Sequence, residues 1–151
     1  MSIESKKAVP GWLILLCVLL VFGSLGRAGT EITNVRRIYE PYFAAHPSLQ
    51  RAVLIYQSVL FGSVCAALFT VLLVYRRTPQ SLITIQNGFL LTIGLRIVAN
   101  WVFPLFADLP PSALSSSYSK RIAGSIAMLA VGALWYLYLV RSKRVREVYA
   151  A

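Results

Sequence analysis

Residues 52–107 read AVLIYQSVLFGSVCAALFTVLLVYRRTPQSLITIQNGFLLTIGLRIVANWVFPLFA, two long apolar runs joined by a short polar connection. A helix of about 20 apolar residues crosses the ~30 Å hydrocarbon core of a membrane. The runs at 52–75 and 82–106 are both long enough. The connection from Arg76 to Ser81 leaves room only for a tight reversal of the chain. This stretch therefore predicts two antiparallel transmembrane helices.

Two further apolar runs, at 9–26 and 122–140, flank this hairpin. Across the chain 13% of the residues are charged, whereas a soluble domain carries about 25%. None of the runs has the strict two-residue alternation of a membrane β-barrel strand. We predict an all-α polytopic membrane protein, in which residues 1–151 form a single domain of four transmembrane helices in an antiparallel bundle.

The first run is open to a second interpretation. Lys6 and Lys7 precede it and the small residues Gly23, Ser24 and Gly26 close it, which is also typical of a cleaved signal peptide. Its uncharged stretch is long for a signal core. We therefore expect a retained first transmembrane helix.

Basic residues are distributed unevenly between the two sides that four helices define. The segments 1–7, 76–81 and 141–151 hold Lys and Arg at about twice the density of 27–51 and 108–121 on the other side. Because basic loops tend to remain in the cytoplasm, we expect both termini there.

The first outer loop, 27–51, has a helical pattern of its own. Its apolar residues recur every three or four positions, and Arg36, Arg37 and Glu40 fall on other faces. Thr30 is a candidate helix cap, and Pro41 should end or bend the helix. We predict a short amphipathic helix in this loop, either on the membrane surface or covering the bundle as a lid. Its apolar residues are Ile32, Val35, Ile38, Tyr39, Tyr42 and Phe43.

Aromatic and basic residues gather near the ends of the runs on the cytoplasmic side. The cytoplasmic basic tail, 141–151, follows an aromatic run end, an arrangement that anchors a helix among lipid headgroups. Its charge favours membrane lipids with anionic headgroups as partners. The expected membrane-interface anchors are Trp12, Trp135, Tyr138, Arg141, Lys143 and Arg144.

Other functional classes find little support. The formal net charge of +10 flanks the runs instead of forming a patch on a soluble domain, so we expect no nucleic-acid partner. His46 has no Cys or acidic cluster beside it, and we interpret Cys17 and Cys65 as small core residues. Acid–base, nucleophilic and metal chemistry need clustered ionisable groups. We therefore expect no catalytic residues, no metal, no cofactor and no enzymatic activity.

Arg96 is the only charged residue inside a predicted span. An arginine at a helix centre costs roughly 2.5–3.5 kcal/mol on insertion scales, so it needs a partner or an escape to the surface. It belongs to a stripe of small or polar residues spaced four apart, which should face other helices. The candidate anion or lipid site is Arg96 with Asn100, Thr92 and Gln57. The stripe consists of Thr84, Gly88, Thr92, Arg96 and Asn100.

Two interpretations of Arg96 stay open. Its long side chain can reach the outer headgroups or bond internally, or it can bind an anion such as a lipid phosphate. No predicted span contains Asp or Glu, so a carboxylate partner must come from Glu31, Glu40 or Asp108 in the outer loops.

Three places in the chain resemble a known family. They are Gly11-Trp12-Leu13-Ile14-Leu15, Tyr75-Arg76-Arg77-Thr78-Pro79, and Trp135-Tyr136-Leu137-Tyr138 followed by Arg141-Ser142-Lys143-Arg144-Val145. Together they resemble a bacterial family of four-span inner-membrane proteins catalogued as domain of unknown function 2569. The resemblance covers essentially the whole chain, and it implies four spans, a cytoplasmic N-terminus and a bacterial inner-membrane location. It implies no activity.

Two functional hypotheses follow. We favour a non-enzymatic accessory or scaffold protein that binds a membrane-protein partner, a second copy of itself or a lipid. The alternative is a small carrier or binding protein for an anionic or lipid ligand centred on Arg96. A polar cavity at Arg96 favours the alternative, whereas a closed interior favours the accessory role.

Overall fold

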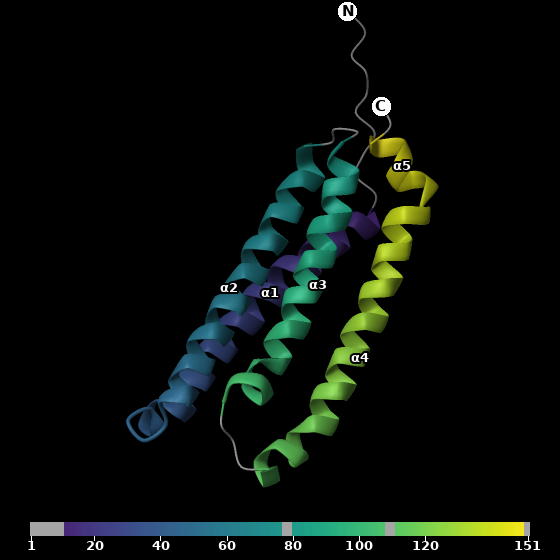
Figure 1. The fold of residues 1–151 in the computed structure, drawn as a ribbon. Coiled ribbons are helices and arrows are strands. Elements are labelled where there is room, and N and C mark those ends of the chain that lie inside the picture. The colour runs from purple at the N-terminus through teal and green to yellow at the C-terminus, as the bar shows by residue number, and fades with distance from the viewer. Residues whose placement is uncertain (1–10, 77–79, 108–110, 150–151) are drawn as a thin grey trace, which may run out of the picture.

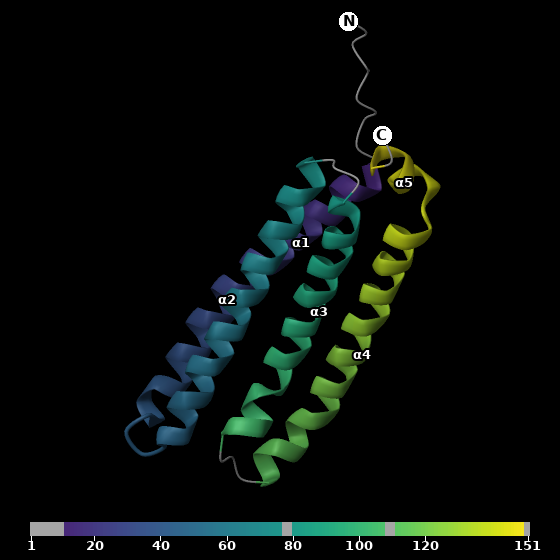
Figure 2. The same cartoon turned by 45° about the horizontal axis from the view of Figure 1, so that its top comes forward.

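The structure, a computed structural model, describes residues 11–76, 80–107 and 111–149, the last range with side chains from Tyr118 onward. The four long helices run side by side in alternating directions (Figure 1), and a second view of the bundle agrees (Figure 2). The predicted all-α helical bundle is thus confirmed. The elements are α1 (Gly11–Tyr39), η1 (Glu40–Tyr42), α2 (Pro47–Arg76), α3 (Ser81–Phe106), α4 (Pro111–Arg141) and α5 (Lys143–Tyr149).

The outer surface of the bundle is apolar. Four of the described helical segments are long and apolar enough to cross a membrane, and each leaves large side chains outside. Phe22, Phe61 and Leu134 are 72%, 67% and 69% exposed. Lipid tails solvate such a surface as well as another helix does, whereas in water it would be an aggregation site. The chain is therefore a multi-pass membrane protein.

Two apolar clusters fill the bundle, one toward each end. The first lies where α1 begins and α4 ends, which we call the terminal end; it includes Leu13, Leu16, Ile85 and Leu139. The second lies toward the opposite end, which we call the loop end, and includes Tyr56 among its members. Both clusters are built from residues three or four apart on each helix, because only one stripe of a helix faces its neighbours.

Close approach of α2 and α3 depends on a glycine. A Cβ atom built on Gly88 would lie 2.3 Å from Oγ1 of Thr70, and Thr70 and Thr92 are both completely buried. Helices in membranes pack through small residues in this way because nothing larger fits between the backbones. Gly88, Thr92 and their stripe therefore lie inside the bundle as predicted, except that Thr84 is exposed.

The structure corrects the prediction of a separate short amphipathic helix in the first outer loop. Residues 27–39 are helical, but they continue the first transmembrane helix without a break, and α1 reaches Tyr39. Thr30 is not a cap, since its hydroxyl donates to the carbonyl of Gly26 within the helix, at 3.0 Å. The glycines at the end of the apolar run permit a bend without imposing one. The helix ends where Pro41 predicts, because the 3-10 turn η1 holds that proline in its first turn.

The basic tail folds back on the terminal end as α5. Val145, Val148 and Tyr149 are buried there, and the Tyr149 hydroxyl donates to the carbonyl of Val74 at 3.0 Å. Tyr149 thereby bonds one of the last carbonyls of α2, which have no partner within their own helix.

The two cysteines have different environments. Both are free, and Cys17 is buried while Cys65 is exposed on the outer face of α2. The expectation that Cys65 is a core residue was therefore wrong, because α2 turns the stripe containing Ser63, Val64 and Ala67 inward instead.

Candidate functional site

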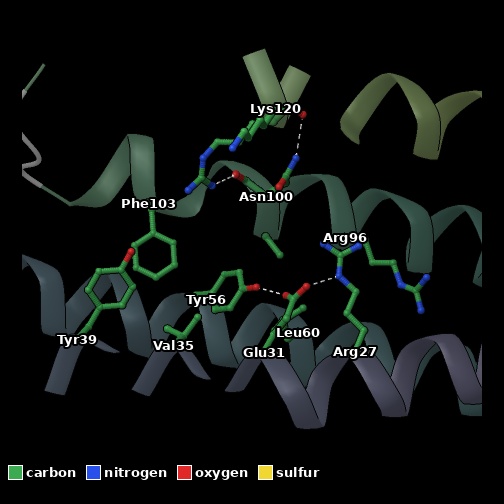
Figure 3. Close-up of a pocket in the computed structure, with 12 residues that line it drawn as sticks. Arg27, Glu31, Val35, Tyr39, Tyr56, Leu60, Arg96, Asn100, Phe103 and Lys120 are labelled. Carbon is green, nitrogen blue, oxygen red and sulfur yellow. Dashed lines mark hydrogen bonds and ion pairs between the residues drawn. The ribbon is translucent and has the colours of Figure 1, made fainter. Parts of the chain in front are cut away.

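A cavity of about 370 Å³ opens between the four long helices, in the half of the bundle nearer the loop end (Figure 3). It borders the second apolar cluster. Side chains from α1, α2, α3 and α4 line it, because the four helices lie side by side at this height of the bundle. The lining residues are Arg27, Glu31, Val35, Tyr39, Tyr56, Leu60, Arg96, Ala99, Asn100, Phe103, Lys120 and Arg121.

The cavity carries an excess of positive charge. Among the residues that the structure describes, four cationic ones, Arg27, Arg96, Lys120 and Arg121, line it together with one carboxylate, that of Glu31. In the low-dielectric surroundings of a membrane bundle, unlike in water, such charges interact strongly with one another and with any anion that enters.

Glu31 is already engaged by two neighbours. Its Oε1 pairs with Nε of Arg27, one turn earlier on α1, and its Oε2 accepts from the hydroxyl of Tyr56 on α2. The carboxylate lies between the two donors in the close-up (Figure 3). Arg27 is thus the cation that Glu31 neutralises, and the arrangement fixes α1 against α2.

Arg96 lines the cavity from α3, and its side chain extends away from Glu31 and Tyr56 at the end of the cavity where Arg27 lies (Figure 3). Its Nη2 donates to Oγ of Ser24 on α1, a residue that is 3% exposed. One neutral hydroxyl satisfies one of the five donors of a guanidinium and none of its charge. The bond to Ser24 therefore leaves the charge of Arg96 uncompensated, and a planar guanidinium is suited to binding an oxyanion.

Asn100 connects α3 to α4 instead of bonding Arg96. Its Nδ2 donates to the carbonyl of Arg121 at 3.0 Å and to Oγ of Ser125 at 3.1 Å. In return, Nη1 of Arg121 donates to the carbonyl of Asn100, and Nε1 of Trp101 donates to Ser125 at 3.2 Å. This network holds Arg121 at the edge of the cavity.

Aromatic rings form the other end of the cavity. The ring of Phe103 lies 5.2 Å from that of Tyr39 and 5.2 Å from that of Tyr56, measured between centroids. Val35 and Leu60 complete this apolar wall. Tyr39 and Phe103 lie on one side of the close-up and Arg27 and Arg96 on the other (Figure 3). The cavity thus has one end formed by Arg27 and Arg96, which we call the cationic end, and an opposite aromatic end, while Lys120 and Arg121 line it from α4.

The structure brings two of the four predicted site residues together. Arg96 and Asn100 line the cavity, whereas Thr92 and Gln57 are not among the lining residues. Thr92 bonds the carbonyl of Gly88 at 2.9 Å, within its own helix.

Of the three carboxylates considered as partners for Arg96, Glu31 lines the cavity. Glu40 lies 3.9 Å from Arg36 in an exposed pair, and Asp108 falls outside the described residues.

The predicted interface anchors gather at the terminal end. Trp12 and Trp135 lie 6.4 Å apart by ring centroids, and Tyr138 meets Trp135 edge-on at 5.9 Å. The contact between Trp12 and Trp135 joins α1 to α4. Arg141, Lys143 and Arg144 are exposed beside them.

Sequence reasoning missed Arg27, Tyr56, Lys120 and Arg121 as lining residues. One available signal was the spacing of four between Arg27 and Glu31, which on a helix makes an ion pair. The spacing predicts an ion pair only if both residues are helical, and Arg27 was assigned to a loop. Lys120 and Arg121 gave no signal, because only the packing of α4 on α3 brings them to the cavity.

Among the described residues, no group of three His, Cys, Asp or Glu side chains could hold a metal ion.

Comparison with known proteins identifies the family but no activity. No curated protein and no solved structure matches the chain. Residues 6–150 match the family described as Protein of unknown function (DUF2569), so the chain belongs to that family.

Proposed function

We propose that this membrane protein binds an anion in the cavity between its four long helices, with Arg96 as the central ligand. The observation that supports the proposal is the lining itself, in whose described part four cationic residues surround one carboxylate. The role that we propose is that of a binding protein or carrier.

The charge balance supports an anion in preference to a cation or a neutral ligand. Glu31 is held by Arg27 and Tyr56, whereas Arg96 donates to the neutral hydroxyl of Ser24. Charges inside a membrane protein are expensive unless they are paired. A phosphate or carboxylate entering the cavity compensates that charge and accepts bidentate hydrogen bonds from a guanidinium.

The expected membrane orientation bears on the side from which the site is reached. The distribution of basic residues favours cytoplasmic termini, and with that orientation the loop end and its cavity lie in the outer half of the membrane. Arg96 lies ~15 Å along α3 from Phe106, at ~1.5 Å per residue. The anion therefore arrives from the outer aqueous phase or from a headgroup of the outer leaflet.

The test is retention of phosphate by purified protein. Wild type and Arg96→Gln, in a neutral detergent, are titrated with inorganic phosphate and followed by calorimetry. Gln keeps a donor for Ser24 but removes the charge. A charge-assisted hydrogen bond contributes about 1.5–3 kcal/mol, so the affinity should fall by roughly 10- to 150-fold. Arg51→Gln is the matched control, because Arg51 is exposed on α2 and does not line the cavity.

A second arm separates a free anion from a lipid headgroup. Native mass spectrometry of protein from nanodiscs of phosphatidylcholine, with and without phosphatidic acid, reports which phosphate remains bound. Phosphatidic acid retained by wild type and lost in Arg96→Gln identifies a lipid ligand. Equal retention by both proteins, together with no phosphate binding in detergent, contradicts the proposal and returns the accessory role as the function to pursue.

A further inference from the structure

The anion-binding cavity is larger than a simple anion requires. Its volume of about 370 Å³ falls within the ~300–1,000 Å³ typical of sites for small organic molecules. A water molecule takes about 30 Å³ of the liquid, so an inorganic phosphate, with five heavy atoms, fills roughly half of such a space at most. The remaining volume needs another occupant.

The wall of the cavity opposite its cationic end is aromatic. Tyr39, Phe103 and Tyr56 form its wall with ring centroids 5.2 Å apart in both pairs. Phe103 is 4% exposed and Tyr56 8%, so packing holds these rings in place before any ligand arrives. A preformed aromatic wall favours a ring or compact apolar group, because edge and offset contacts between rings add to the burial of apolar area.

The two ends of the cavity are separated along the helices. Arg27 is three turns from Tyr39 on α1, and Arg96 is about two turns from Phe103 on α3, which corresponds to ~18 Å and ~10 Å along the axes. Glu31 and Tyr56 lie between them (Figure 3). A ligand that contacts both ends must therefore carry its charge and its apolar group at opposite ends.

We propose that the cavity selects a compact amphiphilic anion, in which a phosphate or carboxylate at the cationic end is joined to an aromatic group against Tyr39 and Phe103. This inference rests on the anion-binding function proposed above and names the class of ligand. The cationic residues contribute attraction common to all anions, whereas the aromatic wall discriminates among them.

The experiment compares three probes that share one charged group. Inorganic phosphate, glycerol 3-phosphate and phenyl phosphate are titrated against wild type in a neutral detergent. Burial of a phenyl ring predicts that phenyl phosphate binds roughly 10- to 150-fold more tightly than glycerol 3-phosphate. Arg96→Gln, measured with phenyl phosphate, corrects for partition of the probe into the micelle.

A wall variant tests the aromatic end separately. Tyr39→Leu keeps an apolar side chain at a half-buried position but removes the ring. The affinity for phenyl phosphate should fall by about 2- to 12-fold, the value of one aromatic pair, and that for inorganic phosphate should not change. If Tyr39→Leu does not fold, Val35→Thr replaces it. This variant adds a hydroxyl to the same wall at nearly constant volume and should weaken the binding of phenyl phosphate but not that of inorganic phosphate.

The outcomes separate this inference from the function on which it rests. If phosphate binds through Arg96 but phenyl phosphate binds no more tightly than glycerol 3-phosphate, the amphiphile is refuted and anion binding stands. If none of the three probes binds, both proposals fail. A preference for phenyl phosphate that Tyr39→Leu leaves intact also refutes the inference, because the ring then lies elsewhere.

Discussion

Gly88→Ala should separate α2 from α3 at their closest approach. The added Cβ would lie 2.3 Å from Oγ1 of Thr70, while the Cβ and Cγ2 atoms of Thr70 would be at ordinary distances of 3.5 and 3.8 Å. The clash is therefore confined to one hydroxyl. Thr70 is completely buried, and that hydroxyl donates to the carbonyl of Ala66 at 2.7 Å.

The structure limits the ways in which this clash can be relieved. Rotating Thr70 sacrifices its hydrogen bond, worth about 0.5–1.5 kcal/mol. Moving the helices apart instead loosens the packing on both sides. Overpacking of a well-filled interior costs typically 1–3 kcal/mol, and we expect Gly88→Ala to lower the free energy of unfolding by about that amount.

Unfolding in mixed micelles, followed by circular dichroism during titration with sodium dodecyl sulfate, measures this change. Gly94→Ala is the control on the same helix, because a Cβ at Gly94 meets nothing within 4 Å. It should change the stability by less than about 1 kcal/mol, since alanine is favoured over glycine in a helix. Thr70→Ala combined with Gly88→Ala should restore most of the loss, because only the hydroxyl clashes.

Two results would refute this reasoning. One is a Gly88→Ala variant as stable as Gly94→Ala, which would mean that α2 and α3 do not approach so closely. The other is a double variant that shows no coupling, since residues in direct contact show interaction energies of about 0.5–3 kcal/mol. Either result would mean that α2 and α3 meet along a different interface, and the position of Arg96 on α3 would have to be reassigned.

Three further predictions concern the cavity, the tail and the orientation. Glu31→Gln should raise the affinity for phosphate by up to about 30-fold in a calorimetric titration, because a carboxylate ~8 Å away opposes the anion by about 2 kcal/mol. An unchanged or lower affinity would exclude the cavity as the anion site. Tyr149→Phe keeps the buried ring but loses the hydrogen bond to the Val74 carbonyl. The free energy of unfolding in the same detergent titration should therefore fall by about 0.5–1.5 kcal/mol. A wild-type value would show that this bond does not stabilise the docking of α5. A green fluorescent protein fused after residue 151 should fluoresce in a bacterial host and an alkaline phosphatase fusion should be inactive, as cytoplasmic termini require; the opposite pair of results would reverse the membrane orientation.

The sequence by itself determined the class and the helices of this protein. Hydrophobic length is a local property, and a run such as 52–75 can satisfy its backbone in lipid only as a helix. The short connection after Arg76 determined that α2 and α3 are antiparallel. The stop at Pro41 was also readable, because proline cannot continue a helix.

Only the tertiary structure decided the site. Whether α1 ends near Gly26 or continues to Tyr39 depends on packing, since glycine permits either course. Once α1 continues, Arg27 and Glu31 enter the bundle, and the packing of α4 on α3 brings Ser125 to Asn100. Rotation about a helix axis is set by contacts between residues far apart in the chain. The sequence therefore identified Arg96, and the fold supplied the cavity around it.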